Sequence, residues 1–186
     1  MQTRTSTETT PCACSGGAER IAAGADAVLR QCGDLVNAVT DDAYRSESRV
    51  LAGGTIGKHL RHTLDHFAAA LAARDGETID YDHRERGVPV ETDRAEAARV
   101  IDSLRSRLAE MRNAALDAPV RVRVMTDADG GEAELGSTRA RELAFAAHHA
   151  VHHQAMMKAI AAEFGAHVAH EFGRAPSTLN HDRATR

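Results

Sequence analysis

The chain of 186 residues is long enough for one domain with a sizeable hydrophobic core. Hydrophobic residues make up 42% but aromatic residues only 3%, and tryptophan is absent, a composition that favours closely packed helices over a β-sandwich. The formal net charge of −4, without a block of basic residues, argues against a nucleic-acid partner. No apolar run approaches the ~20 residues that span a bilayer, and the N-terminal segment lacks the apolar core of a secretory signal, so we expect a cytoplasmic protein without membrane contact.

Residues 1–17 are small and polar and end in Ser15-Gly16-Gly17, which predicts a disordered N-terminal tail. The tail contains Cys12 and Cys14. A thiol pair for metal or redox chemistry is one interpretation, and two reduced, solvent-exposed thiols are the favoured one, because a flexible tail has no fixed geometry. With Cys32 the count of cysteines is odd, which argues against a disulfide framework.

Apolar residues at helical spacing predict a first helix over about 18–41, with Cys32 in its apolar stripe as a small core residue. Residues 42–54 form a connection. A second helix is predicted from a Thr55 N-cap to about Arg74.

Residues 77–91 form a polar segment that is long for a loop in a compact domain. A solvated crossover with ion pairs is slightly favoured over a substrate-binding loop. If the segment folds over the end of the helices, four of its residues are candidate substrate contacts, namely Tyr81, Asp82, His83 and Arg84.

A third helix is predicted from a Thr92 N-cap to about Leu116. The hydrophobic period then changes to alternation over residues 120–135, with a glycine-rich turn, which predicts a short β-hairpin. The fourth helix begins at a Ser137 or Thr138 cap and ends near Phe164, and residues 166–186 form a C-terminal tail.

Seven of the eleven histidines lie in two short helical windows, residues 59–66 and 148–153. At 100° per residue, His149 and His153 fall about 40° apart on the apolar side of the fourth helix. His148 and His152 fall outside the apolar arc. In the second helix, His59, His62 and His66 form one stripe on the flank of the apolar face. Amphipathicity slightly favours His59 or His66 as the inward-pointing residue, and periodicity does not choose the third ligand.

Two inward-facing histidines on one helix have two interpretations. They are core residues satisfied by hydrogen bonds, or they share a metal ion. Burying two unpaired imidazoles would cost about 1–3 kcal/mol each, and a shared cation removes that cost. Imidazole is the commonest protein ligand for transition metals, so metal binding is the favoured interpretation.

Two motifs together, His62-Thr-Leu-Asp65 and His149-Ala-Val-His152-His153, resemble the DinB/YfiT-like family of small helical metalloproteins. The resemblance covers about residues 18–165. It implies an all-α fold, a four-helix bundle with a short β-hairpin inserted before the last helix. It also implies one divalent metal ion, zinc or nickel, held by His62, His149 and His153, and the choice of His62 rests on the resemblance alone.

Members of that family include thiol-dependent transferases and isomerases and metal-dependent hydrolases. The resemblance therefore implies a metal-dependent enzyme, with a thiol-dependent S-transferase as the favoured class and a low-molecular-weight thiol as the candidate substrate. The alternative is a non-catalytic metal-binding or stress-related helical module.

Asp65 could orient a ligand or move a proton, or pair with Arg61 at the surface. The additional His59 and His66 depart from the family pattern and could reshape the site. The substrates of other family members therefore cannot be assigned to this protein. A homodimer is compatible with so alanine-rich a bundle.

Overall fold

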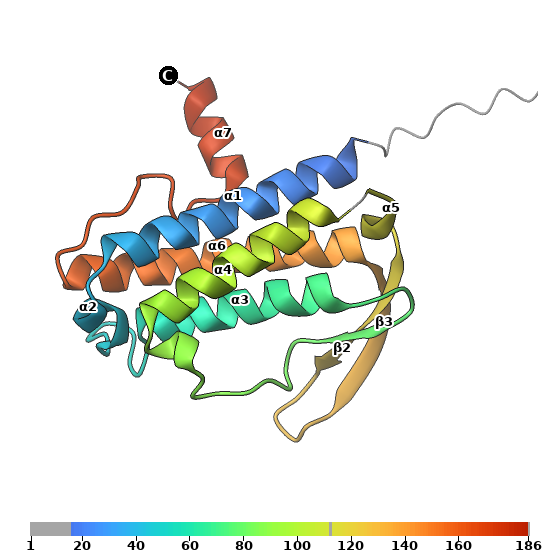
Figure 1. Cartoon of the computed structure of the whole chain (residues 1–186), viewed down its shortest axis with the longest axis horizontal. Helices are drawn as coiled ribbons and strands as arrows, with labels where there is room; N and C mark the ends of the chain where they lie inside the picture. Colours follow the sequence, from blue (N-terminus) through green and yellow to red (C-terminus); the bar gives the residue numbers. More distant parts are fainter. Residues whose placement is uncertain (1–15, 112, 186) are drawn as a thin grey trace, which may run out of the picture.

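The computed structural model describes residues 16–111 and 113–185. Cys12, Cys14 and most of the predicted N-terminal tail lie outside the described residues. Four long helices pack side by side around one core (Figure 1): α1 (Gly17–Ala38), α3 (Ile56–Ala72), α4 (Arg94–Glu110) and α6 (Arg139–Glu163). The described chain is thus mostly helical, as its composition predicts.

Small and aliphatic side chains fill the core, which is what the scarcity of aromatic residues requires. Each long helix contributes an apolar stripe at helical spacing that faces the other helices. The largest fully buried side chains in this core include Tyr44, Phe67, Leu29, Leu35, Ile101, Leu143, Met157 and Ile160. Cys32 is fully buried among them, as predicted, and burial raises the pKa of its thiol to about 12.

Polar side chains begin three of the long helices. Thr55 accepts a hydrogen bond from the Lys58 amide at the start of α3, and Thr138 accepts one from Arg141 at the start of α6, as predicted. The predicted Thr92 cap of α4 is wrong, since Asp93 accepts from the amides of Ala95 and Glu96. A carboxylate can satisfy two free amides of the first turn together and also suits the positive end of the helix dipole.

Two of the predicted helices end earlier than expected. The first ends at Ala38 because Val39 is extended, and Thr40 then caps the short helix α2 (Asp41–Arg45), which lies almost wholly in the segment predicted as a connection. The third ends at Glu110 because Met111 is extended, and α5 (Asn113–Leu116) follows. Apolar residues keep their helical spacing past Glu110, so the pattern did not reveal this break.

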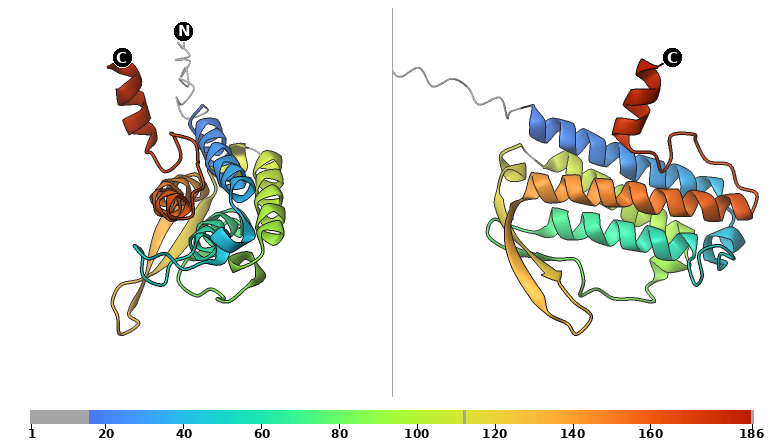
Figure 2. Two further views of the ribbon diagram at one scale, coloured as in Figure 1. Left: turned by 90° about the vertical axis from the view of Figure 1, so that its left-hand side faces the viewer. Right: turned by 180° about the vertical axis from the view of Figure 1, so that it is seen from behind.

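A small three-stranded sheet lies at the end of the molecule where α3 finishes and α6 begins (Figures 1 and 2). The predicted strands are β2 (Pro119–Met125) and β3 (Glu132–Thr138), which pair antiparallel. The third strand, β1 (Thr78–Asp80), was not predicted and pairs parallel with β2. Ile79, Tyr81, Val120 and Val122 form a second, smaller apolar cluster under the sheet.

The remainder of the polar segment wraps along α3 and ends in a short 3₁₀ helix, η1 (Pro89–Glu91). After α6, Phe172 returns to the main core and is only 3% exposed, although it follows the predicted bundle boundary. The last helix, α7 (Pro176–Ala184), projects away from the others (Figure 2) and buries none of its residues.

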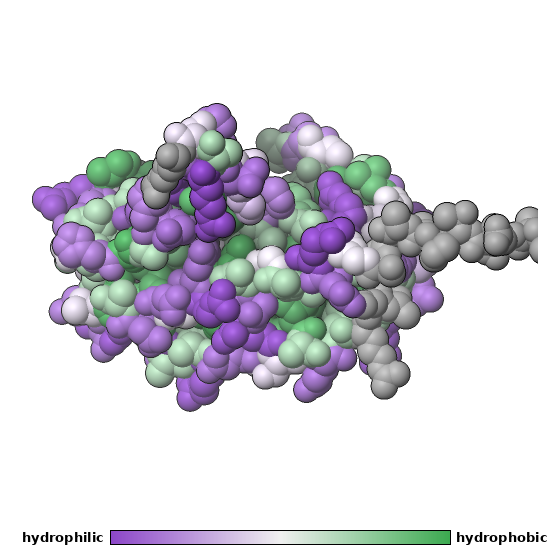
Figure 3. Space-filling view, turned by 90° about the horizontal axis from the view of Figure 1, so that it is seen from above, coloured by the Kyte–Doolittle hydropathy of each residue, from purple (hydrophilic) through white to green (hydrophobic). Residues whose placement is uncertain are grey.

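Figure 3 shows the face that carries α7, where hydrophilic side chains surround scattered apolar areas. Within the described part of the chain, no helix is both long and apolar enough to cross a membrane.

Gly57 lets the first turn of α3 approach η1. A Cβ atom at this position would lie 1.9 Å from the carbonyl oxygen of Glu91 and 2.8 Å from a ring carbon of Tyr44. The first neighbour is backbone and cannot rotate away. We therefore expect Gly57→Ala to lower the free energy of unfolding by about 1–3 kcal/mol, as measured by urea denaturation.

Gly24→Ala in α1 is the matched control. Nothing lies within 4 Å of a Cβ atom there, and alanine in a helix interior should stabilise the protein by about 0.5–1 kcal/mol. Equal stability of the Gly57→Ala variant and the wild type would contradict the close approach of α3 to η1.

Candidate metal centre

Three histidine side chains from two neighbouring helices converge on one point. His62 lies on α3, and His149 and His153 lie one turn apart on α6, which runs beside α3 (Figure 1). Nε2 of His149 is 2.9 Å from Nε2 of His62 and 3.1 Å from Nε2 of His153. One ring nitrogen from each histidine falls within 4.8 Å of the other two. The structure therefore brings together the three residues singled out from the sequence.

The helical spacing of α6 predicted which of its histidines face inward. His153 is buried and His149 is half-buried, whereas His148 and His152 are exposed. The angular prediction for this helix is confirmed, because one face of a straight helix is set by its residue spacing alone.

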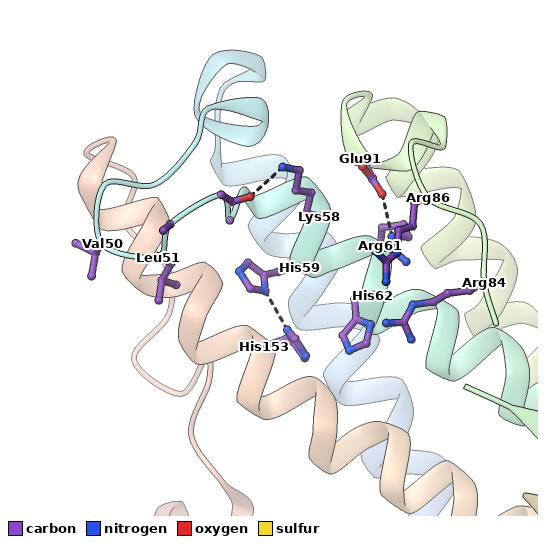
Figure 4. Close-up of a pocket in the computed structure, with 13 residues that line it drawn as sticks. Val50, Leu51, Lys58, His59, Arg61, His62, Arg84, Arg86, Glu91 and His153 are labelled. Atoms are coloured by element: carbon purple, nitrogen blue, oxygen red, sulfur yellow. Dashed lines mark hydrogen bonds and ion pairs between the residues drawn. The ribbon is translucent and has the colours of Figure 1, made fainter. Parts of the chain in front are cut away.

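Two further histidines of α3 surround the cluster without joining it. Nδ1 of His59 lies 3.0 Å from Nδ1 of His153 (Figure 4), so His59 contacts the far side of that ring. Nδ1 of His66 donates to the carbonyl oxygen of His62 at 2.9 Å. The His66 ring also stacks between Tyr81 and His149, with ring centroids 4.8 and 4.4 Å away. Both residues thus support the rings of the cluster.

Burial keeps the three central imidazoles neutral. Loss of water around the rings lowers the pKa of His62 to about 2, of His153 to about 3 and of His149 to about 4. The neighbouring histidines lower these pKa values further, and the Arg84 charge does so for His62 and His149. At neutral pH each ring therefore keeps a free nitrogen lone pair.

The donor set fits a divalent cation. Three nitrogens bound at ~2.0–2.1 Å around a tetrahedral ion would lie about 3.3 Å apart, close to the spacing between neighbouring nitrogens here. Hydrogen bonds alone satisfy the group poorly, because Nε2 of His149 faces two other Nε2 atoms and a neutral imidazole nitrogen either donates or accepts. A cation held by three nitrogens also keeps coordination positions for water or substrate.

An open cleft of about 790 Å³ leads to the cluster, with His62 and His153 in its wall (Figure 4). The segment before α3 forms one side, and the polar segment after β1 forms the other. Charged residues make up much of the remaining wall: Lys58, Arg61, Arg84, Arg86 and Glu91.

Asp65 pairs with Arg61. Its Oδ2 accepts a hydrogen bond from Nη1 of Arg61 at 2.8 Å, and Nε of Arg61 lies 3.1 Å from Glu91. Burial raises the pKa of the Asp65 carboxyl, against the lowering effect of the Arg61 charge. Of the roles considered for Asp65, the structure shows the ion pair with Arg61, which lies within α3. The Arg61–Glu91 ion pair ties α3 to η1.

The four candidate contacts in the polar segment have separate positions. Tyr81 is buried and donates to Glu142 at 3.0 Å, and Asp82 accepts from the Met125 amide at 2.8 Å. His83 pairs with Asp80 at 3.0 Å. Of these four residues, Arg84 is the one that lines the cleft.

Sequence reasoning missed Lys58 and Arg86 as residues of the cleft. Lys58 is adjacent in sequence to His59, and Arg86 is two positions from Arg84, both of which the sequence analysis named. That proximity in sequence was the signal that could have found them.

The depressed pKa values predict how the stability of the metal-free protein depends on pH. An unfolded histidine titrates near its ordinary value of 6.5, whereas folded His149 and His153 titrate near 4 and 3. Between these values the unfolded state binds more protons, so stability falls as the pH drops from 6.5 toward 4. We expect urea midpoints, measured with a chelator present, to fall over this range.

The variant His149→Gln/His153→Gln lacks both titrating groups and should show a smaller decline over the same pH range. Parallel curves for this variant and the wild type would contradict the burial of neutral imidazoles.

Comparisons with known proteins identify a family and a curated relative. The family model of the DinB superfamily matches residues 33–157, a span that contains His62, His149 and His153. The FK506-binding protein 5 of Rhizopus delemar is 33% identical over 157 residues, which is 83% of this chain and 36% of that protein. The chain therefore spans about a third of the length of this curated relative. The search of solved structures finds no significant match. The match of the family model over most of the chain shows that the protein belongs to the DinB superfamily.

Proposed function

We propose that this protein binds one divalent metal ion through His62, His149 and His153 and uses it in catalysis. The observation that carries the proposal is the convergence of three neutral ring nitrogens from α3 and α6 beside an open cleft. The proposed architecture around the ion is the four-helix bundle of α1, α3, α4 and α6, with the β2–β3 hairpin inserted before the last of these helices.

The chain's own residues would orient the ligands. If Nε2 of His153 binds the ion, its proton resides on Nδ1, where it can be donated to Nδ1 of His59. That contact would fix both the tautomer and the rotation of the His153 ring. His66 would act on the opposite side, where its ring packs against His149 and its Nδ1–H anchors it to the backbone of α3.

The ion would supply Lewis acidity, which lowers the pKa of a bound thiol or water molecule. The cleft would then hold the second reactant against the histidine wall. We propose a thiol-dependent S-transferase as the reaction class and a low-molecular-weight thiol as one substrate, on the resemblance to the family. Zinc and nickel are the proposed ions, since imidazole nitrogens suit both.

A non-catalytic metal-binding module is the second candidate function. An enzyme is favoured because the cluster is open to a cleft of about 790 Å³, whereas a purely structural ion is usually enclosed by four protein ligands. The homodimer and the cytoplasmic location remain predictions from the sequence.

The metal site predicts a contrast between two pairs of histidines on the same helix. His149→Ala/His153→Ala should abolish stoichiometric metal in the purified protein, as measured by elemental analysis, because two of three ligands are lost. His148→Ala/His152→Ala is the matched control and should retain the metal, since both side chains are exposed. Metal retained by the first variant would refute the ligand assignment.

The third ligand is tested by single substitutions in α3. His62→Ala should lower metal affinity most. His59→Ala and His66→Ala should lower it by about 10–100-fold, the typical effect of losing a residue that orients a metal ligand. A larger loss of metal affinity in His59→Ala or His66→Ala than in His62→Ala would show that His62 is not the third ligand.

A cobalt-substituted protein distinguishes the two candidate functions. A catalytic site has exchangeable coordination positions, so the visible spectrum of cobalt should change when a small thiol such as cysteine or glutathione is added. A spectrum that does not respond to thiols or to other small ligands would favour the structural module and would count against the enzyme.

A further inference from the structure

The cleft beside the histidine cluster carries more positive than negative charge. Its cations are Lys58, Arg61, Arg84 and Arg86, and its carboxylate is Glu91. The existing partners of each cation determine which of them are available to a ligand.

Two of the four cations are already occupied. Arg61 contacts Asp65 at 2.8 Å, and its Nε lies at an ion-pair distance of 3.1 Å from Glu91 although that nitrogen makes no hydrogen bond among the described residues. Two carboxylates therefore neutralise its charge. Lys58 donates to the carbonyl oxygen of Gly53 at 2.9 Å and lies 3.7 Å from Glu47. These residues build the wall of the cleft.

Arg84 is incompletely paired. Its Nη1 donates to the carbonyl oxygen of Tyr81, but its Nε is buried without a hydrogen-bond partner among the described residues. Asp65 is 3.9 Å from that Nε and is already bonded to Arg61. An uncompensated buried donor on a charged group is costly, so it indicates a partner supplied by a ligand.

Arg86 adds a second available cation. Its side chain is exposed at the edge of the cleft, and within the described ranges no carboxylate lies at ion-pair distance from it. Arg84 and Arg86 lie two positions apart in the irregular segment that runs beside α3.

The position of Arg84 brings positive charge close to the histidine cluster. Figure 4 shows its guanidinium reaching toward His62 from the opposite side of the cleft. Burial lowers the pKa of Arg84 and the nearby Arg61 charge lowers it further, against the raising effect of the Asp65 and Asp82 carboxylates. A negatively charged ligand beside His62 would relieve both effects.

We propose that Arg84 and Arg86 form an oxyanion subsite that binds a carboxylate or phosphate group of a small-molecule substrate next to the histidine cluster. Arginine suits both groups because its planar donors can bond two oxygens at once. The cleft volume of about 790 Å³ accommodates a small organic acid with its anionic end on Arg84 and the remainder facing the histidines. The inference rests on the proposed function, since it names the substrate class of the same site.

The test measures anion binding by the full-length protein without metal, so that coordination of the anion to an ion cannot contribute. Succinate and inorganic phosphate are titrated separately by calorimetry, and their relative affinity distinguishes a carboxylate subsite from a phosphate subsite. We expect millimolar or tighter binding of at least one probe by the wild type. Absence of binding of both probes would overturn the proposal.

Arg84→Met should weaken binding of the preferred probe about tenfold or more, because charge-assisted hydrogen bonds are lost. Arg86→Met should weaken it less, since that side chain is more exposed. Arg84→Lys keeps the charge but not the paired donors, and should bind with intermediate affinity. Arg107→Met, an exposed arginine on α4 away from the cleft, is the matched control and should bind as the wild type does.

Equal binding by Arg84→Met and the control would refute the subsite, provided that thermal melts show both variants folded. Metal content is measured on the same variants and should equal that of the wild type. Failure of the anion subsite would therefore appear in the titrations alone. Failure of the metal site would appear in the elemental analysis of the wild type.

Discussion

The contact between α3 and α6 is the constraint on which the site depends. His62 and His149 are 87 positions apart in sequence. Their ring nitrogens lie 2.9 Å apart because the two helices pack side by side, aligned so that these residues face each other. Other contacts fix each of these helices against its remaining neighbours. Gly57 allows α3 to approach η1, and Gln154 of α6 donates a hydrogen bond to the carbonyl oxygen of Val28 in α1 at 3.2 Å. A shift of one residue along either helix would turn the imidazoles away from one another.

Placing this many imidazoles inside a helical core has an energetic consequence. Each of the three central rings is partly stripped of water and resists protonation, so the apo cluster is a source of instability that increases as the pH falls. A cation shared by the rings would offset this instability, because a ligand that binds only the folded state raises the free energy of unfolding. Under the proposed function, stability and metal affinity would therefore be coupled properties of the same residues.

The cleft combines two chemically different walls. The neutral histidine wall belongs to the helices α3 and α6, whereas the basic wall includes the irregular segment between β1 and η1. The small sheet positions that segment: β1 pairs with β2, and Asp82 accepts a hydrogen bond from the Met125 amide at the end of β2. Tyr81, directly after β1, donates a hydrogen bond to the buried Glu142 and stacks on His66. The sheet thus connects the basic wall to the helices that carry the histidines.

Helical periodicity by itself determined the four long helices, the buried position of Cys32 and the inward direction of His149 and His153, because residue spacing sets which side chains share a face of one helix. It could not decide which histidine of α3 faces the cluster, since His59, His62 and His66 lie on one stripe and the choice depends on the packing of α3 against α6. It also missed β1, whose hydrogen-bond partners lie in a strand about 40 positions later. The sequence made Arg84 a candidate contact only on the condition that the polar segment folds over the helices, and it did not single out Arg86. The tertiary structure decided that both line the cleft, because their positions depend on how that segment lies along α3.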